Sequence, residues 1–139
     1  MKPSDKITPH FTWHEALWLP SWRVYADPTS EEAKNIIDMA QRMERVRSVF
    51  GAPIHVHCWL RPGDYNRFVG GVKDSQHILG KAVDFHVQGF EGEEGCQLIR
   101  EMLMTKLDTY GLRMEDKQGA WIHLDSKEVP AGGNRFFKP

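Results

Sequence analysis

Apolar residues that recur at three- and four-residue steps indicate the main helix of the chain. The pattern runs from about residue 30 to residue 50 and predicts one amphipathic helix with a charged outer face. Thr29 and Glu32 form a capping box at its start, and Gly51 follows its last turn. We therefore expect this helix to pack its apolar stripe on the core and to take no part in chemistry.

Two further helices are predicted on either side of the main one. Thr12 and Glu15 form another capping box, which predicts a short helix that ends near Leu19. Downstream, spaced apolar residues predict a helix over about 93–109, and Gly111 follows it.

Aromatic residues are dense in and after the first helix. Two interpretations stay open: the rings pack as a lid over the core, or one or two of them line a substrate groove. The residues concerned are Phe11, Trp13, Trp18, Trp22 and Tyr25.

Alternation of apolar and polar side chains predicts the strands. Residues 53–62 and 81–87 each alternate, so one face of each strand is expected to be buried. The segments 110–115 and 120–125 flank a short polar turn and predict a β-hairpin. Segment 61–71 carries Pro-Gly and Gly-Gly turn signals and is predicted to be a loop, and the Gly/Pro-rich tail is predicted to be irregular.

Together these elements predict an α+β fold in a single domain over residues 1–139, with a small antiparallel sheet packed against two main helices. Hydrophobic content of 40% and charged content of 27% are typical of a globular domain. The formal net charge of -1 gives no basic field, so we expect no nucleic-acid partner. We also expect no membrane span and no signal peptide, because no sufficiently long apolar run occurs.

Cys58 and Cys96 are the two cysteines of the chain. They could pair in principle, but in a cytosolic chain we expect two reduced, buried thiols.

Polar side chains at three positions suit a metal ion. His77 precedes strand 81–87, Asp84 lies on its outward face, and His123 lies on the outward face of segment 120–125. Two imidazoles and one carboxylate leave the fourth position of a tetrahedral zinc open, as a catalytic zinc requires. The sequence therefore predicts a catalytic zinc site.

A second histidine pair competes with this set. His55 and His57 lie two apart on one face of strand 53–62, but no third ligand with suitable spacing accompanies them. We expect surface or hydrogen-bonded histidines there. His86 shares a face with Asp84 and is expected to be a partly exposed histidine that binds no metal, although a supporting hydrogen bond or a substrate contact is possible.

The chain resembles the zinc D-alanyl-D-alanine carboxypeptidase family of peptidoglycan peptidases in the segments SQHILGKAVD (75–84) and WIH (121–123). That family includes phage endolysins that cut L-alanyl-D-glutamate bonds. The resemblance covers roughly residues 10–126 and extends to Arg61 and Asn66.

The resemblance implies roles for five residues. His77, Asp84 and His123 correspond to the ligands of Zn²⁺. Ser75 corresponds to a residue that contacts the substrate peptide, and Arg61 to an arginine that binds or polarises the substrate near the scissile carbonyl. Chemistry agrees with these roles, because zinc lowers the pKa of a bound water and a guanidinium stabilises an oxyanion or a terminal carboxylate.

One position departs from the family pattern. Many members carry an acid three residues before the second histidine as the general base, and this chain has Ala120 there. Asp125 is our choice for the base, because residues 123 and 125 share a strand face. It could instead orient His123 as a supporting partner. Glu115 and Asp116, across the hairpin, are the alternative bases.

The resemblance implies zinc-dependent hydrolysis of a peptide bond in the peptidoglycan stem peptide, of the D-Ala-D-Ala carboxypeptidase or the L-Ala-D-Glu endopeptidase type. A non-catalytic zinc-containing module that binds peptidoglycan or belongs to a phage particle is the alternative, motivated by Ala120. An unrelated intracellular zinc amidohydrolase is a third. We expect a monomer that is made in the cytoplasm and acts on the cell wall after release, as a phage endolysin does.

Overall fold

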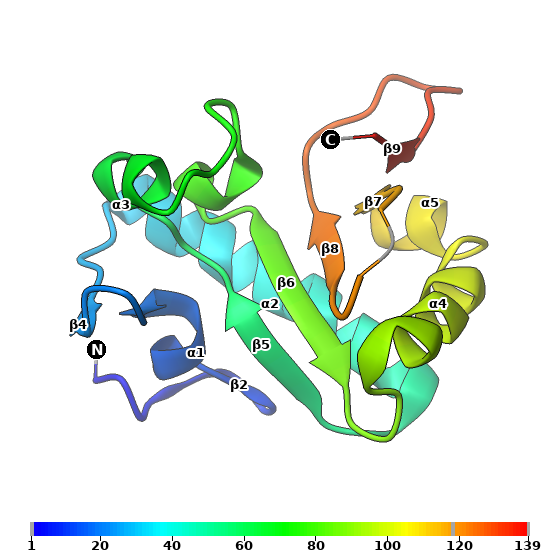
Figure 1. Cartoon of the computed structure of the whole chain (residues 1–139), viewed down its shortest axis with the longest axis horizontal. Coiled ribbons are helices and arrows are strands. Elements are labelled where there is room, and N and C mark those ends of the chain that lie inside the picture. The colour runs from blue at the N-terminus through cyan, green and yellow to red at the C-terminus, as the bar shows by residue number, and fades with distance from the viewer. Residues whose placement is uncertain (1, 118, 139) are drawn as a thin grey trace.

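A five-stranded sheet in the order β5-β6-β8-β7-β9 lies at the centre of the computed structural model, which describes residues 2–117 and 119–138 (Figure 1). Neighbouring strands are antiparallel, except that β7 and β9 are parallel. This arrangement confirms the α+β fold. The strands are β5 (Ile54–Cys58), β6 (Ala82–Val87), β7 (Arg113–Glu115), β8 (Ile122–Asp125) and β9 (Phe136–Phe137).

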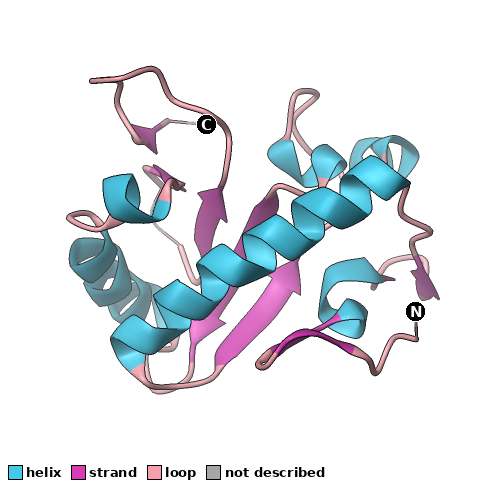
Figure 2. Ribbon diagram, turned by 180° about the vertical axis from the view of Figure 1, so that it is seen from behind, coloured by secondary structure: helices cyan, strands magenta, loops and turns pink. Residues whose placement is uncertain are grey.

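The main helix, α2 (Ser30–Phe50), crosses the back of the sheet, as Figure 2 shows. Its capping box is formed as predicted: Glu32 donates its backbone N–H to Thr29 Oγ1 at 3.1 Å, and the Glu32 carboxylate accepts from the Thr29 N–H at 2.9 Å. The helix ends at the predicted glycine, Gly51. Its buried side chains are Ile36, Met39, Ala40, Met43 and Val46.

The other predicted helices are partly confirmed. α1 (Trp13–Leu17) has its capping box, but the single helix predicted over 93–109 is wrong, because α4 (Gly92–Leu103) and α5 (Leu107–Tyr110) are separated by a turn. Periodicity does not reveal the turn, since buried Leu103 and Leu107 keep a four-residue spacing across it. Among the described residues, no helix has the length and apolar character needed to cross a membrane.

Two segments that were predicted to lack regular structure contain short elements. The predicted loop 61–71 includes α3 (Gly63–Phe68), which buries Tyr65 and Asn66, and the tail includes β9. Elements of this length span too few periods to leave a pattern in the sequence. The N-terminal part also forms two small ribbons, β1 (Lys6–Thr8) with β2 (Phe11–Thr12) and β3 (Trp18–Leu19) with β4 (Val24–Tyr25).

The N-terminal aromatic segment packs on the β5 side of the molecule. Phe11 is fully buried and meets the ring of Trp59 edge-on, with ring centroids 5.9 Å apart. Trp13 is also buried, whereas Tyr25 is exposed. Phe11 and Trp13 therefore pack onto the core, as the lid interpretation predicts.

The two faces of the sheet differ as the alternation predicts. Val83 and Phe85 of β6 and Leu124 of β8 are fully buried in the core that α2 covers. Asp84 follows Val83 and His123 precedes Leu124, so both side chains point to the opposite face. The two residues are direct cross-strand partners. Strand pairing thus brings together two side chains that are 39 residues apart in the chain.

Gly80 connects the site to the main helix and yields a test of the fold. It ends the 3₁₀ helix η1 (Gln76–Leu79) at φ +75°, and a Cβ there would lie 3.0 Å from Ile36 Cγ1 and 3.2 Å from the Glu32 carbonyl oxygen. We expect Gly80→Ala to lose about 1–2 kcal/mol of unfolding free energy to backbone strain and a further ~1–3 kcal/mol to overpacking.

Gly89→Ala is the matched control, because Gly89 has φ +90° but its Cβ would meet nothing within 4 Å. Urea unfolding of both variants measures the difference. Equal losses would show that η1 does not pack tightly on α2.

Candidate metal centre

A groove of about 790 Å³ lies over the sheet face opposite α2. One wall comes from residues 69–76, which precede β6. Another comes from residues of the connection between β7 and β8, such as Lys117, Ala120 and Trp121. All but one of the site residues proposed from the sequence line it; Asp116 is the exception. Those in the lining are Arg61, Ser75, His77, Asp84, Glu115, His123 and Asp125.

His77 is held in one tautomer by the backbone. Only 1% of the residue is exposed, and its Nδ1 lies 2.7 Å from the Trp59 carbonyl oxygen. Because a carbonyl oxygen only accepts, Nδ1 carries the proton and donates it. In the neutral imidazole Nε2 therefore carries the lone pair, and it lies 3.1 Å from Asp84 Oδ1.

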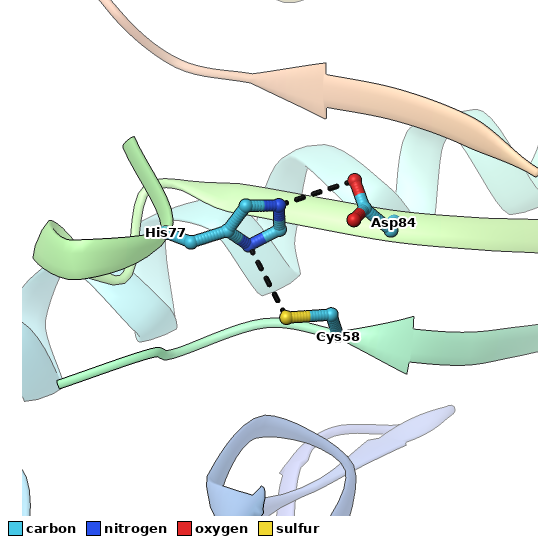
Figure 3. Close-up of side chains that lie close together, drawn as sticks. All are labelled: Cys58, His77 and Asp84. Carbon is cyan, nitrogen blue, oxygen red and sulfur yellow. Dashed lines mark hydrogen bonds and ion pairs between the residues drawn. The ribbon is translucent and has the colours of Figure 1, made fainter. Parts of the chain in front are cut away.

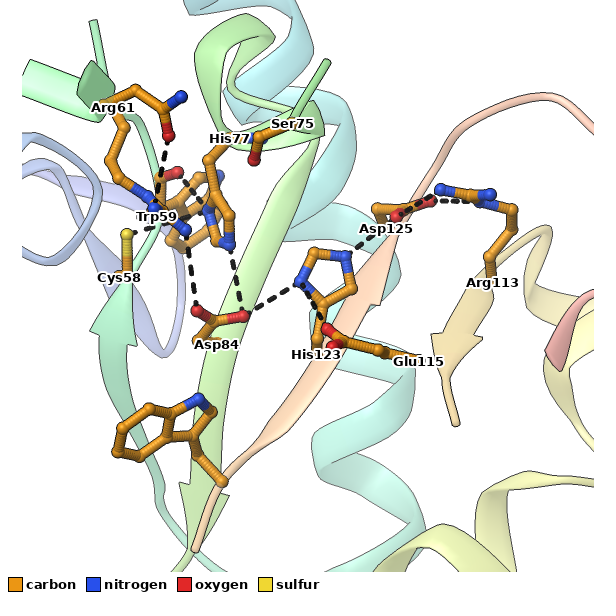
Figure 4. A network of polar contacts seen from close by, with 12 residues as sticks. Cys58, Trp59, Arg61, Ser75, His77, Asp84, Arg113, Glu115, His123 and Asp125 are labelled. Atoms are coloured by element: carbon orange, nitrogen blue, oxygen red, sulfur yellow. Dashed lines mark hydrogen bonds and ion pairs between the residues drawn. The ribbon is translucent and has the colours of Figure 1, made fainter. Parts of the chain in front are cut away.

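His123 is held in the opposite tautomer by a carboxylate. Its Nε2 donates to Asp125 Oδ2 at 2.8 Å, which leaves the lone pair on Nδ1. Nδ1 lies 3.0 Å from Asp84 Oδ1, the same oxygen that His77 faces (Figure 4). The two imidazoles therefore direct their free lone pairs at one carboxylate oxygen.

Such an arrangement of acceptors fits a metal cation. Lone pairs that face a carboxylate repel it unless a proton or a cation lies between them. In a tetrahedral zinc site with ligands at about 2.0–2.1 Å, neighbouring ligand atoms lie about 3.3 Å apart, close to the separations of 3.0 and 3.1 Å here. Two imidazoles and one carboxylate are a ligand set that zinc accepts, and both distances from an imidazole nitrogen to Asp84 suit it.

The pKa values of these groups show how strongly the site attracts positive charge. Burial lowers the pKa of His77, but the Asp84 carboxylate more than offsets this and raises it to about 10. Burial raises the pKa of Asp84, yet His77 and His123 hold it well below its usual range. Burial lowers the pKa of His123, but the hydrogen bonds that its protonated ring donates to Asp125 and Asp84 outweigh this, and the pKa is raised.

Cys58 lies on the other side of His77. Ligand atoms of Cys58, His77 and Asp84 all lie within 4.8 Å of one another, so this cluster could also bind a metal ion. However, Cys58 Sγ is 3.7 Å from Nδ1 of His77, the nitrogen that faces away from Asp84 (Figure 3). The sulfur therefore contacts the edge of the His77 ring that is opposite Asp84. Both cysteines are free thiols, as expected, although Cys58 is only half-buried.

Asp125 is fully buried and its oxygens are occupied. Arg113 donates to it twice, from Nε at 2.8 Å and from its terminal NH2 at 2.9 Å, and the Lys127 backbone N–H donates at 3.2 Å. Burial raises the pKa of Asp125, but the hydrogen bonds from His123 and Arg113 lower it overall. Sequence reasoning missed Arg113, because its position opposite Asp125 follows from the register of β7 and β8.

Glu115 points into the groove from β7. Its Oε2 lies 3.9 Å from Nδ1 of His123, on the side where the free lone pairs meet (Figure 4). The Glu115 side chain is 18% exposed, so solvent reaches it. A carboxylate beside the metal position and open to water is suited to accept a proton.

Arg61 is positioned by its neighbours. Its backbone N–H donates to the His77 carbonyl oxygen at 2.9 Å, and its terminal NH1 donates to Asn66 Oδ1 at 3.2 Å. The other terminal nitrogen lies 4.0 Å from Asp84 Oδ2. Ser75 caps η1, accepting the His77 backbone N–H at 3.2 Å. Both residues are thus fixed beside the metal ligands.

A family model described as Peptidase M15 matches residues 10–125 of the chain. The matched segment includes all three zinc ligands proposed from the sequence. A comparison with curated proteins finds no match.

Proton release provides a test of the metal centre. With a pKa of about 10, His77 is protonated in the metal-free protein at about pH 6, whereas zinc binds only the neutral imidazole. We expect one zinc ion per chain and release of at least one proton on binding. At that pH a zinc-bound water, with a pKa of about 7, contributes little.

Calorimetry in two buffers with different ionisation enthalpies measures this release. The control is His77→Ala, which should lose zinc binding itself. A binding enthalpy that does not depend on the buffer would contradict the proposed ligand set.

Proposed function

The chain belongs to the peptidase M15 family of zinc metallopeptidases, and we propose that it hydrolyses a peptide bond of the peptidoglycan stem peptide. The observation that carries the proposal is the convergence of His77, Asp84 and His123 in a groove that a peptide can enter. A zinc ion held there supplies a polarised carbonyl and an activated water, which is the chemistry of peptide hydrolysis.

The charge of the groove supports an acidic peptide as substrate. Six lysine and arginine side chains line it against four aspartates and glutamates, whereas the whole chain has a net charge of -1. Stem peptides carry free carboxylates, which such a field attracts. The lining of the groove includes residues of loop 69–76 as well as Trp121. This extent favours a substrate that continues past the scissile bond, and hence the L-Ala-D-Glu endopeptidase type.

We assign the general base to Glu115 and an orienting role to Asp125. Glu115 faces the metal position and water, so it can take the proton of the attacking water. The oxygens of Asp125 already accept hydrogen bonds from Arg113 and His123, and its lowered pKa opposes further proton uptake. Asp125 instead fixes the tautomer of His123, as carboxylates do for metal-bound histidines.

Arg61 and Ser75 bind the substrate in this proposal. The Arg61 guanidinium lies beside Asp84, where it can stabilise the developing oxyanion or pair with a substrate carboxylate. Asn66, which is buried, holds it there. The Ser75 hydroxyl lines the groove and can donate to a peptide carbonyl.

Cleavage of synthetic stem peptides tests the function. The zinc-loaded protein should produce new amine termini detectable by mass spectrometry, and Glu115→Gln should lower kcat by about two to four orders of magnitude while zinc stays bound. The control is Glu128→Gln, because Glu128 is an exposed acid outside the groove lining.

Two outcomes would contradict these assignments. Peptide binding without any cleavage by the wild-type protein would favour the non-catalytic module. Ala120 is consistent with that alternative, because many family members carry an acid at this position. Full activity of Glu115→Gln would remove Glu115 as the base.

The role of Asp125 predicts a different phenotype. Asp125→Asn should weaken zinc affinity roughly 10- to 100-fold, because His123 loses the partner that fixes its tautomer. Activity should return when excess zinc is supplied. Measuring zinc content and kcat in the same samples separates the two roles: a large loss of kcat with zinc fully bound would identify Asp125 as the base.

A further inference from the structure

Three histidines gather on the sheet face outside the groove. His55 and His57 belong to β5, and His86 of β6 is the cross-strand partner of His55. The ring of His86 lies between the other two, with centroids 4.8 Å from His55 and 4.9 Å from His57. From the sequence alone, the pair on β5 had no third ligand. Strand pairing supplies one.

Nitrogen atoms of two of the three histidines already lie close together. His57 Nε2 and His86 Nδ1 lie 2.7 Å apart, so two imidazole nitrogens face each other directly. His55 is oriented by a contact of 3.2 Å between its Nε2 and Gln88 Oε1. Both His55 and His57 are exposed, so small side-chain rotations meet little resistance from packing.

We infer that His57 and His86, with His55 as a third ligand, form a second binding site for a divalent transition metal. Imidazole is a ligand preferred by Cu²⁺, Ni²⁺ and Zn²⁺. A bound ion would replace the hydrogen bond between His57 Nε2 and His86 Nδ1. The imidazole that now donates would move its proton to its other ring nitrogen, so that each ring offers the ion a lone pair. This site is separate from the metal centre, because the three histidines are not among the described residues that line the groove. It does not depend on the proposed function.

Trp121 gives the site an optical signal of its own. Its ring centroid lies 5.4 Å from that of His57, and the residue is 52% exposed. A paramagnetic Cu²⁺ ion on His57 would therefore quench the fluorescence of this tryptophan by close contact.

A copper titration of the zinc-loaded protein tests the inference at about pH 7.5, because a metal ion binds the neutral imidazole. We expect saturable quenching with one Cu²⁺ bound per chain and the zinc retained, both measured by elemental analysis after gel filtration. His57→Gln and His86→Gln should each weaken copper binding by roughly ten-fold or more, and His55→Gln should weaken it as well.

Two controls make the result specific. His10→Gln changes a histidine that pairs with Glu44 on another part of the surface and should leave copper binding unchanged. Trp121→Phe should lose most of the quenching while copper uptake persists. Copper binding that is equal in the wild type, His57→Gln and His86→Gln would overturn the inference, as would uptake that occurs only with release of zinc.

Discussion

Each imidazole of the metal centre is fixed by the hydrogen bond on the far side of its ring. The Trp59 carbonyl holds the proton of His77 on Nδ1, and Asp125 holds that of His123 on Nε2. Because of these two contacts, the free lone pairs meet at Asp84. Without them either ring could turn its N–H toward the carboxylate and satisfy it with a simple hydrogen bond. The fit of the two imidazoles and Asp84 to a cation depends on this constraint.

The fold supplies the fixing partners from elements that surround the ligands. Trp59 directly follows β5, and its indole N–H donates to the Gly80 carbonyl oxygen, which ties the end of η1 to the same residue that orients His77. On the other side, Arg113 of β7 holds Asp125 in place with two hydrogen bonds. The ligands thus lie between two hydrogen-bonded partners, Trp59 and the Arg113–Asp125 pair, and α2 covers the back of the sheet. Such support keeps a catalytic site within its productive geometry.

Two groups of imidazoles share one face of the sheet but differ in surroundings. His77 is 1% exposed, next to a carboxylate and inside a groove, whereas His55 and His57 lie in solvent beside another histidine. Burial next to Asp84 places the first group beside a fixed negative charge, which raises the pKa of His77 and favours a cation there. The second group has neutral ligands only, so it suits an ion that binds more weakly and exchanges with solvent.

Local sequence patterns determined α1, α2, the main strands and the side of the sheet on which Asp84 and His123 lie, because each of these depends on residues a few positions apart. They did not reveal α3 or the turn between α4 and α5. The spacing within 75–84 also indicated the ligand types. Only the tertiary structure placed Arg113 opposite Asp125, Glu115 beside His123 and His86 between two histidines of β5. These neighbours follow from strand register and from the length of the connecting turns, which bring together residues distant in the chain. A sequence pattern shows which face a side chain takes, but strand pairing decides what it meets there.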